Sequence, residues 1–167
     1  MKLTDLLPLE KWMEFEQEIS RRSGLGANVF GTDGVRITDF HHWPNRLCPA
    51  IKATDKGQAF ICAVAHMNLA TEAVNTSAPV VEECDAGLMK MVVPIIVNGE
   101  YLGAVGACGL LRDDNEPDAF LINKISEIDE EKVEELAQGI STISSDKVKE
   151  LEEYMVGEVS KIVSEFK

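Results

Sequence analysis

The strongest constraint on the fold is a pair of long apolar segments, 88–97 and 100–111, separated only by Asn98 and Gly99. Asn-Gly is the preferred pair for a two-residue type I′ turn, which needs positive φ at both positions. The two segments therefore predict a long β-hairpin. Pro94 lies inside the first segment and has no backbone N–H, which indicates a strand edge or a bulge at that position.

Shorter patterns add strands and helices around this hairpin. Amphipathic helices are expected at 4–23 and 55–75, where apolar residues recur every three or four positions. Further strands are expected at 27–31, 35–38 and 80–84. Five strands joined mainly by hairpins cannot form a doubly wound parallel sheet. The sequence therefore predicts an α/β fold of the α+β type, with a central antiparallel sheet of about five strands and helices packed on it, as in PAS and GAF domains.

The last third of the chain is strongly acidic. Residues 113–167 hold 16 acidic and 6 basic side chains, and we expect helices at 116–125, 129–139 and 144–166. The last of these carries an apolar stripe with near-heptad spacing: Val148, Leu151, Met155, Val159, Ile162 and Phe166. The stripe fits two arrangements, a helix packed on its own domain or a seam between the two copies of a homodimer.

Charge and composition exclude several classes of protein. The chain of 167 residues has a formal net charge of −13, which disfavours nucleic acid as a partner because polyanion binding needs concentrated Lys and Arg. The same charge disfavours an anionic membrane surface. No apolar run approaches the length of a membrane span, and acidic residues throughout 1–18 argue against a signal peptide. We expect a soluble, cytoplasmic protein with reduced cysteines.

Three short motifs make the region around the hairpin specific: C-x-A-G-L at 84–88, V-V-P-I at 92–95 and N-G-x-x-L-G at 98–103. Together with Cys48 ahead of a long helix, they make residues 5–125 similar to the PocR sensory domain. The resemblance implies a ligand-sensing module related to PAS and GAF folds. It also implies a small hydrocarbon derivative such as propanediol as the ligand, and a link to a DNA-binding, kinase or cyclase output domain.

The chain shows no helix-turn-helix and no kinase motif, so we expect a stand-alone sensor that passes its state to a separate output protein. The resemblance divides the chain into a sensory, ligand-binding domain at 1–125 and an acidic helical extension at 126–167. We expect the extension to pack on the sensory domain or to dimerise.

The glycines of the hairpin suggest where a ligand would bind. Gly103, Gly106 and Gly109 thin the second strand, which leaves room either for a ligand or for the close approach of the long helix. A small-molecule pocket is typically apolar with a few polar groups at its rim. The residues predicted to bind the ligand are Cys62, His66, Cys84, Asp85, Gly87, Val93, Ile95, Val105 and Ala107.

The cysteines support a second hypothesis. Cys62 and His66 are four residues apart and share a helical face, and thiolate and imidazole are common ligands of zinc and iron. Cys48, Cys62, Cys84 and Cys108 are therefore candidate ligands of a metal ion or an iron–sulfur cluster in a redox sensor. None of their spacings is C-x-x-C, and buried unreactive thiols explain the same residues. His41 and His42 fall in a polar loop, where exposure to solvent is the simpler explanation.

Catalysis is not expected. Cys62 and His66 form the one candidate nucleophile–base pair, and no third residue that would orient the base can be named. The acidic residues beside Cys84 would raise the pKa of that thiol and weaken it as a nucleophile. The sequence contains no phosphate-binding Gly-Lys loop, no G-x-S-x-G and no H-E-x-x-H motif.

Overall fold

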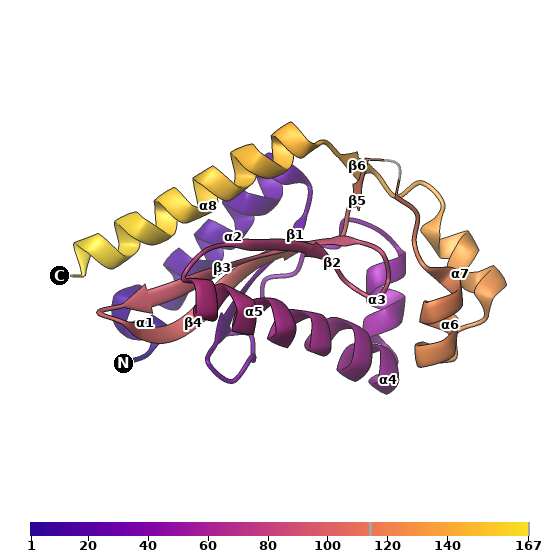
Figure 1. Cartoon of the computed structure of the whole chain (residues 1–167), viewed down its shortest axis with the longest axis horizontal. Coiled ribbons are helices and arrows are strands. Elements are labelled where there is room, and N and C mark those ends of the chain that lie inside the picture. Colours follow the sequence, from indigo (N-terminus) through magenta and orange to yellow (C-terminus); the bar gives the residue numbers. More distant parts are fainter. Residues whose placement is uncertain (114, 167) are drawn as a thin grey trace.

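The computed structural model describes residues 1–113 and 115–166. Its main sheet has four antiparallel strands in the order β1-β4-β3-β2 (Figure 1). The strands are β1 (Gly26–Gly31), β2 (Val80–Glu83), β3 (Met89–Val97) and β4 (Glu100–Cys108). The predicted hairpin, β3 and β4, forms the centre of the sheet.

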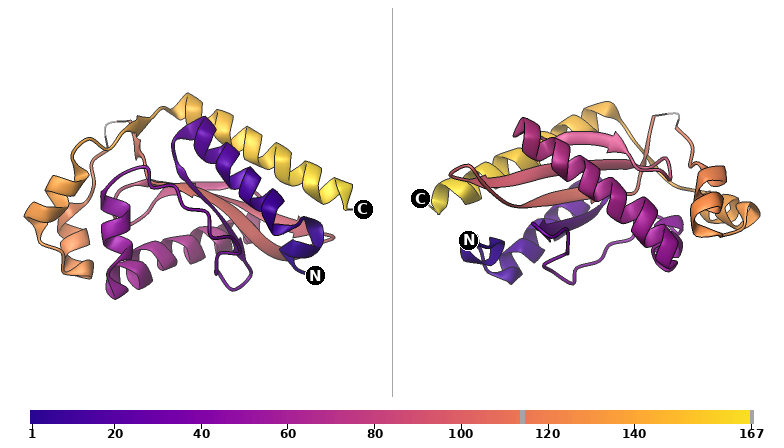
Figure 2. Two further views of the ribbon diagram at one scale, coloured as in Figure 1. Left: turned by 180° about the vertical axis from the view of Figure 1, so that it is seen from behind. Right: turned by 60° about the horizontal axis from the view of Figure 1, so that its bottom comes forward.

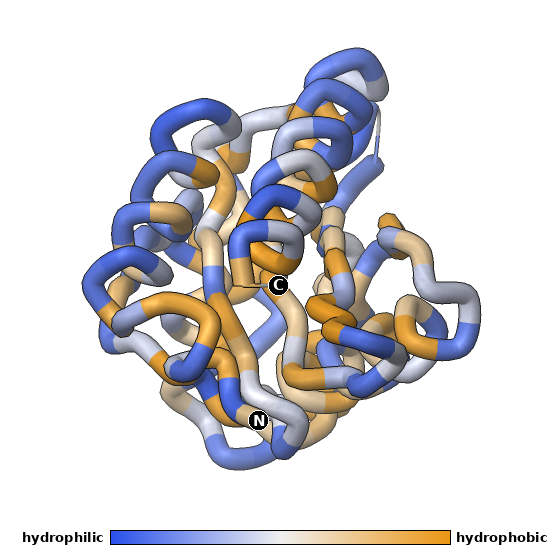
Figure 3. Tube along the Cα trace, turned by 90° about the vertical axis from the view of Figure 1, so that its left-hand side faces the viewer, coloured by the Kyte–Doolittle hydropathy of each residue, from blue (hydrophilic) through white to orange (hydrophobic). Residues whose placement is uncertain are grey.

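Helices cover both faces of the sheet (Figure 2). α2 (Leu9–Ser23) and α8 (Ser145–Glu165) lie side by side on one face, and α5 (Val64–Thr76) lies on the other. The main core fills the space between the first pair of helices and the sheet. Figure 3 shows the corresponding pattern, with apolar residues along the strands and polar residues around the outside of the helices. The expected α+β architecture is confirmed.

The remaining elements lie at the ends of these layers. Leu111 and Thr142 pair in a short parallel ladder that the sequence did not predict. The elements are α1 (Leu3–Leu6), α3 (Leu47–Lys52), α4 (Asp55–Gly57), the π-helical stretch η1 (Gln58–Ala63), β5 (Leu111–Arg112), α6 (Ala119–Ser126), α7 (Glu130–Ala137) and β6 (Thr142–Ile143). None of the helices within the described ranges combines the length and apolar character needed to span a bilayer.

The hairpin turn forms as its two residues predict. Asn98 has φ 52° and Gly99 has φ 83°, the positive values that a type I′ turn needs. A register shift between Ile95 and Ile96 then bends the hairpin beside Pro94. The bulge predicted near the proline is therefore present one residue away from it.

Pro94 also lies where its missing N–H costs nothing. The backbone N–H of Met89 donates to Leu110 on the β4 side of β3, at 2.8 Å. Because backbone polar groups alternate along a strand, the nitrogen of Pro94 points to the opposite side, toward β2. β2 pairs only as far as Val92 of β3, so the proline interrupts no ladder.

Two predicted elements differ from the structure. The strand expected at 35–38 is reduced to a single bridge between Phe30 and Arg36. Arg36 uses its side chain instead, donating to the backbone oxygens of Ala27 at 2.9 Å and Phe40 at 2.8 Å. The helix expected at 55–75 forms, but as three joined pieces, α4, η1 and α5, with a π-helical middle.

α8 packs on its own sheet. All members of its apolar stripe except Phe166 are buried in the main core, and the ring of Phe166 is 41% exposed. Tyr154 adds contacts with α2, since its ring lies edge-on to Phe15 and beneath the guanidinium of Arg22. Of the two arrangements that fit the stripe, the structure has the helix packed on its own domain, because these side chains are already buried within one chain. A homodimer stays a prediction.

A buried carboxylate ties α2 to the sheet. Glu16 has no exposed surface and accepts hydrogen bonds from the backbone N–H of Val29, at 2.8 Å, and from the hydroxyl of Thr38. Burial raises the pKa of Glu16 above its usual 4.5, although these two hydrogen bonds and the nearby Arg36 charge lower it. The hydrogen bonds of Glu16 therefore connect α2 to β1 and to the segment after β1. They offset part of the free energy needed to remove its carboxylate from water.

The raised pKa of Glu16 predicts a pH-dependent stability. Between pH 4.5 and the raised pKa the folded chain binds more protons than the unfolded chain, so the free energy of unfolding falls as pH rises through this window. Gln at position 16 does not titrate, so the variant lacks this contribution. We therefore expect the free energy of unfolding of wild type minus that of Glu16→Gln to decrease as pH rises, as measured by urea denaturation at several pH values. Glu10→Gln, at an exposed position of the same helix, is the control, and a pH-independent difference for Glu16→Gln would contradict the prediction.

Candidate functional site

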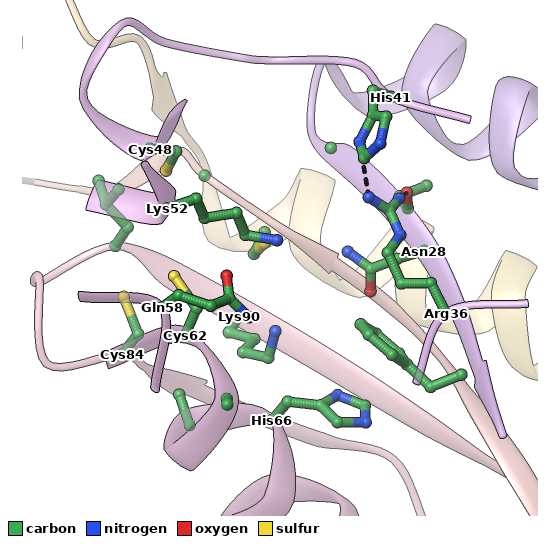
Figure 4. A pocket seen from close by; sticks show the side chains of 18 of the residues that line it. Asn28, Arg36, His41, Cys48, Lys52, Gln58, Cys62, His66, Cys84 and Lys90 are labelled. Carbon is green, nitrogen blue, oxygen red and sulfur yellow. Dashed lines mark hydrogen bonds between the residues drawn. The ribbon is translucent and has the colours of Figure 1, made fainter. Parts of the chain in front are cut away.

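A cavity of about 180 Å³ lies on the sheet face that α5 only partly covers. Its floor is formed by β1 and the ends of β3 and β4, and its walls are formed by α3, η1, the first turn of α5 and the loop after β1 (Figure 4). α5 packs farther along the sheet, on Val92 and Ala104. The cavity therefore occupies the sheet end between α5 and α3.

Strand register sets the polar groups of the floor. Lys90 of β3 is paired with Cys108 of β4, and both line the cavity. Asn28 of β1 is paired with Gly106 of β4, one pleat farther along. Phe30, two residues beyond Asn28, continues the same face of β1. Three neighbouring strands thus contribute side chains to a single surface.

The helical wall contains the π-helical stretch. η1 carries Gln58 and Cys62 to the cavity, and α5 continues the wall with Ala65 and His66. π-helical turns are rare and are frequently found at functional sites. Thr54 starts this helical run, because its side-chain oxygen accepts a hydrogen bond from Gly57 N–H at 3.0 Å. The wall is therefore built by a capped helix with a widened turn beside the cavity.

The cavity is cationic although the protein is acidic. Arg36, Lys52 and Lys90 line it, and Asp33 is the single acidic residue among the lining side chains. Lys90 is only 5% exposed and has no hydrogen bond or ion pair within the described part of the chain. Its ammonium lies 5.9 Å from the centre of the Phe30 ring. The side chain of Lys90 is thus enclosed by the fold, and its amino group, which is not among the fully buried unpaired atoms, points into the open space of the cavity (Figure 4).

Three further polar atoms at the cavity are buried without a hydrogen-bond partner among the described residues: Asn28 Oδ1, Arg36 Nε and His66 Nδ1. Asn28 and His66 are 5% and 4% exposed. Native proteins leave few buried polar atoms unpaired. Three such atoms around one cavity indicate a surface shaped to meet a polar molecule.

His66 is neutral in this setting. Burial, followed by the charges of Lys90 and Lys52, lowers the pKa of His66 to about 3. Its ring also packs on Phe30, with 3.7 Å between ring centres. At neutral pH the imidazole therefore offers one N–H donor and one acceptor, and it adds no charge to the cavity.

The loop after β1 forms the outer rim. His41 is exposed, as expected, and its Nδ1 accepts a hydrogen bond from the Arg36 guanidinium at 2.8 Å. The His41 ring stacks on Trp43 with 5.6 Å between centres, and Lys52 lies 5.7 Å from the Trp43 ring. His42, also exposed, lines the same rim.

All four cysteines line the cavity as half-buried side chains with free thiols. Burial raises the pKa of Cys48 to about 12 and that of Cys62 to about 11, and it also raises the pKa of Cys84. These three thiols stay protonated at neutral pH, so they are weak nucleophiles. Within residues 1–113 and 115–166, no group of three or more His, Cys, Asp or Glu side chains is arranged to hold a metal ion.

The same pKa values bear on the candidate catalytic pair. A Cys62 thiol with a pKa of about 11 and a His66 imidazole with a pKa of about 3 do not form an activated nucleophile and base.

The predicted ligand-binding residues divide into three groups: residues that line the cavity, residues of the turn before β3, and residues on the other face of the sheet. Cys62, His66 and Cys84 line the cavity. Asp85 is exposed and Gly87 is half-buried, and neither lines the cavity. Gly87 instead fits closely against the backbone of Glu116.

The four predicted residues of β3 and β4 lie on the face of the sheet opposite the cavity. They are buried in the main core beneath α2 and α8: Val93, Ile95, Val105 and Ala107. Side chains alternate across a strand, so the residues between them face the cavity side. The prediction identified the correct strands, and the apolar character of these residues concealed which face was which.

The glycines of β4 each have a different structural reason. A side chain at Gly103 would collide with the backbone oxygen of Phe30, 2.1 Å from the Cβ position, and a side chain at Gly106 would meet Asn28 Oδ1 at 2.6 Å. At Gly109 it would meet the ring of Pro44 at 2.3 Å. Gly109 alone of the three lines the cavity. The glycines therefore admit neighbouring residues of the fold rather than the long helix.

Sequence reasoning missed the polar residues Asn28, Arg36, Lys52 and Lys90. Lys90 gave a usable signal, since it is a lysine inside an otherwise apolar strand and lies in alternation with Val92. Such a position is either at an exposed edge or directed into a functional cavity. Asn28 gave the same signal in β1, between Ala27 and Val29.

Comparison with known proteins identifies one family. A family model described as the sensory domain found in PocR matches residues 5–166, nearly the whole chain. The resemblance noted in the sequence is thus confirmed, and the match continues beyond residue 125 through α8. No curated protein and no solved structure gives a significant match. The division of the chain at residue 125 stays a prediction.

The unpaired charge of Lys90 predicts a substitution that does not destabilise the protein. Lys90→Met keeps about the length of the side chain and removes an ammonium that has no counter-charge among the described residues, so we expect the free energy of unfolding to stay at the wild-type value or to rise by up to about 1 kcal/mol. Urea denaturation of the purified protein measures this change. The control Lys147→Met, at an exposed position, should change stability by less than about 0.5 kcal/mol. A Lys90→Met protein less stable than wild type would contradict the prediction.

Proposed function

Because the chain belongs to the PocR sensory-domain family, we propose that it is a small-molecule sensor and that its ligand binds in the cavity between the sheet, α3 and η1. The observation that carries the proposal is a set of buried polar atoms, on residues that line this cavity, that have no hydrogen-bond partner among the described residues. A binding surface leaves such groups for the ligand to satisfy.

The cavity limits the size of the ligand. Its volume of about 180 Å³ lies below the ~300–1,000 Å³ that is typical of small-molecule pockets. The ligand is therefore a small organic molecule of a few carbon atoms. Phe30, Ala65 and Leu88 supply apolar contact surface, while Asn28 and His66 supply polar groups. This combination suits an amphipathic molecule.

Ligand binding would link the sheet to the helical wall. Asn28 and Lys90 belong to the sheet, whereas Lys52 belongs to α3 and Cys62 to η1. A ligand held between these groups stabilises one spacing of α3 and η1 relative to the strands. We propose that a separate output protein reads this spacing, in a cytoplasmic signalling system and without catalysis by this chain.

Filling the cavity should abolish ligand binding. The probes are propane-1,2-diol and sodium propanoate, and a probe that binds only the folded protein stabilises it by about 2.7 kcal/mol at 100 times its dissociation constant. We expect at least one probe to raise the melting temperature of wild type. Ala63→Phe, which extends a ring from η1 into the cavity, should remove the shift.

Ala59→Phe is the matched control, because Ala59 belongs to the same π-helical stretch but is exposed and lies outside the cavity lining. This variant should keep the shift seen with wild type. An equal shift in Ala63→Phe, or the failure of both probes and of all other diols, alcohols and acids of two to six carbons, would contradict a ligand site in this cavity.

A further inference from the structure

We propose that the ligand is an anion, a small organic acid whose carboxylate binds Lys90 and Lys52. The inference rests on the proposed function and names the chemical class of the molecule that the cavity takes. Neither amino group has a carboxylate partner among residues 1–113 and 115–166, and both belong to side chains that line the cavity.

The charge of the cavity opposes that of the whole molecule. The chain has a formal net charge of −13, yet three cationic side chains and one acidic side chain line this cavity. Acidic residues are abundant elsewhere in the chain. If Lys90 served only to stabilise the fold, we would expect one of them to form an ion pair with it. The missing counter-charge is supplied by the ligand, since a carboxylate forms a strong, charge-assisted hydrogen bond with an ammonium that the fold encloses.

The donors point toward a common space. In Figure 4 the amino groups of Lys52 and Lys90 and the side-chain amide nitrogen of Asn28 all point into the cavity, from α3, β3 and β1 respectively. Arg36 Nε adds a fourth donor, buried and without an acceptor among the described residues. Four donors on one small cavity match the acceptor-only oxygens of a carboxylate.

The remaining lining sets the other end of the ligand. The rings of Phe30 and the neutral His66 pack against each other at a tilt, and both residues line the cavity with Lys90. The protonated thiols of Cys62 and Cys84 are weakly polar. These groups favour a short aliphatic chain. A cavity of about 180 Å³ favours such a small molecule over a phosphorylated sugar or a nucleotide.

Matched acids and neutral analogues test the inference. Sodium propanoate and sodium lactate are compared with propanamide and propane-1,2-diol in thermal melts, with sodium chloride at equal ionic strength as the baseline. We expect the acids to raise the melting temperature of wild type and the neutral analogues to leave it unchanged. Isothermal titration calorimetry with the better acid should give at least tenfold weaker binding for Lys90→Met and for Lys52→Met.

Lys56→Met is the matched control. Lys56 lies in α4, just after α3 and outside the cavity lining, and forms an exposed ion pair with Glu127 at 3.2 Å, so this variant should bind the acid like wild type. Urea denaturation of Lys90→Met, described above, checks that this variant is folded, so that weaker binding can be assigned to the lost amino group. Nuclear magnetic resonance at pH 7 supplies a second measurement, since an acid bound beside Lys90 should shift the ring signals of His66, which lines the same cavity.

The outcomes separate this inference from the proposed function. A shift with propane-1,2-diol but not with the acids, lost in Ala63→Phe, would overturn the anionic ligand and keep the sensor. Acid binding that Lys90→Met and Lys52→Met leave unchanged would also overturn it. If neither acids nor neutral analogues bind, or if Ala63→Phe binds as wild type does, both the inference and the proposed function fail.

Discussion

The alternation of side chains across three paired strands is the constraint on which the rest of the structure depends. In β3, Met89 and Met91 enter the core beneath α2 and α8, while Lys90 between them faces the opposite side. A one-residue slip of register would bury the lysine in the main core and turn both methionines into the cavity. The core and the polar surface of the cavity therefore specify the same register, and each strengthens the other.

Local signals predicted the fold well because they act over a few residues. Asn98-Gly99 fixed the hairpin, Gly24 ended α2 in the left-handed conformation, and Ser144 capped α8 through its hydroxyl. The predictions failed where longer-range contacts decide the outcome. The strand expected at 35–38 has good strand residues, but the side chain of Arg36 bonds to backbone oxygens across the loop and little ladder remains. The stripe on α8 could not reveal from spacing alone that its partner is its own sheet.

The candidate site could be predicted only in part, for a related reason. The sequence identified the helix that carries Cys62 and His66 and the strand end that carries Cys84, and all three line the cavity. Hydrophobicity then misassigned the faces of β3 and β4, since both faces of this sheet are buried and both read as apolar. Asn28 and Lys90 belong to strands that β4 separates in the sheet, so only the assembled register brings them to one surface.

The use of α8 as an internal packing element limits how this protein can signal to others. The apolar side of the helix is buried in the core. Its solvent-exposed side carries carboxylates and ammonium groups such as Glu153 and Lys161. Any chain that recognises this side must do so through charge, and added electrolyte would weaken that recognition within a Debye length of roughly 8 Å at physiological ionic strength. Binding at this surface would therefore depend on salt concentration, unlike binding through an apolar contact between two helices.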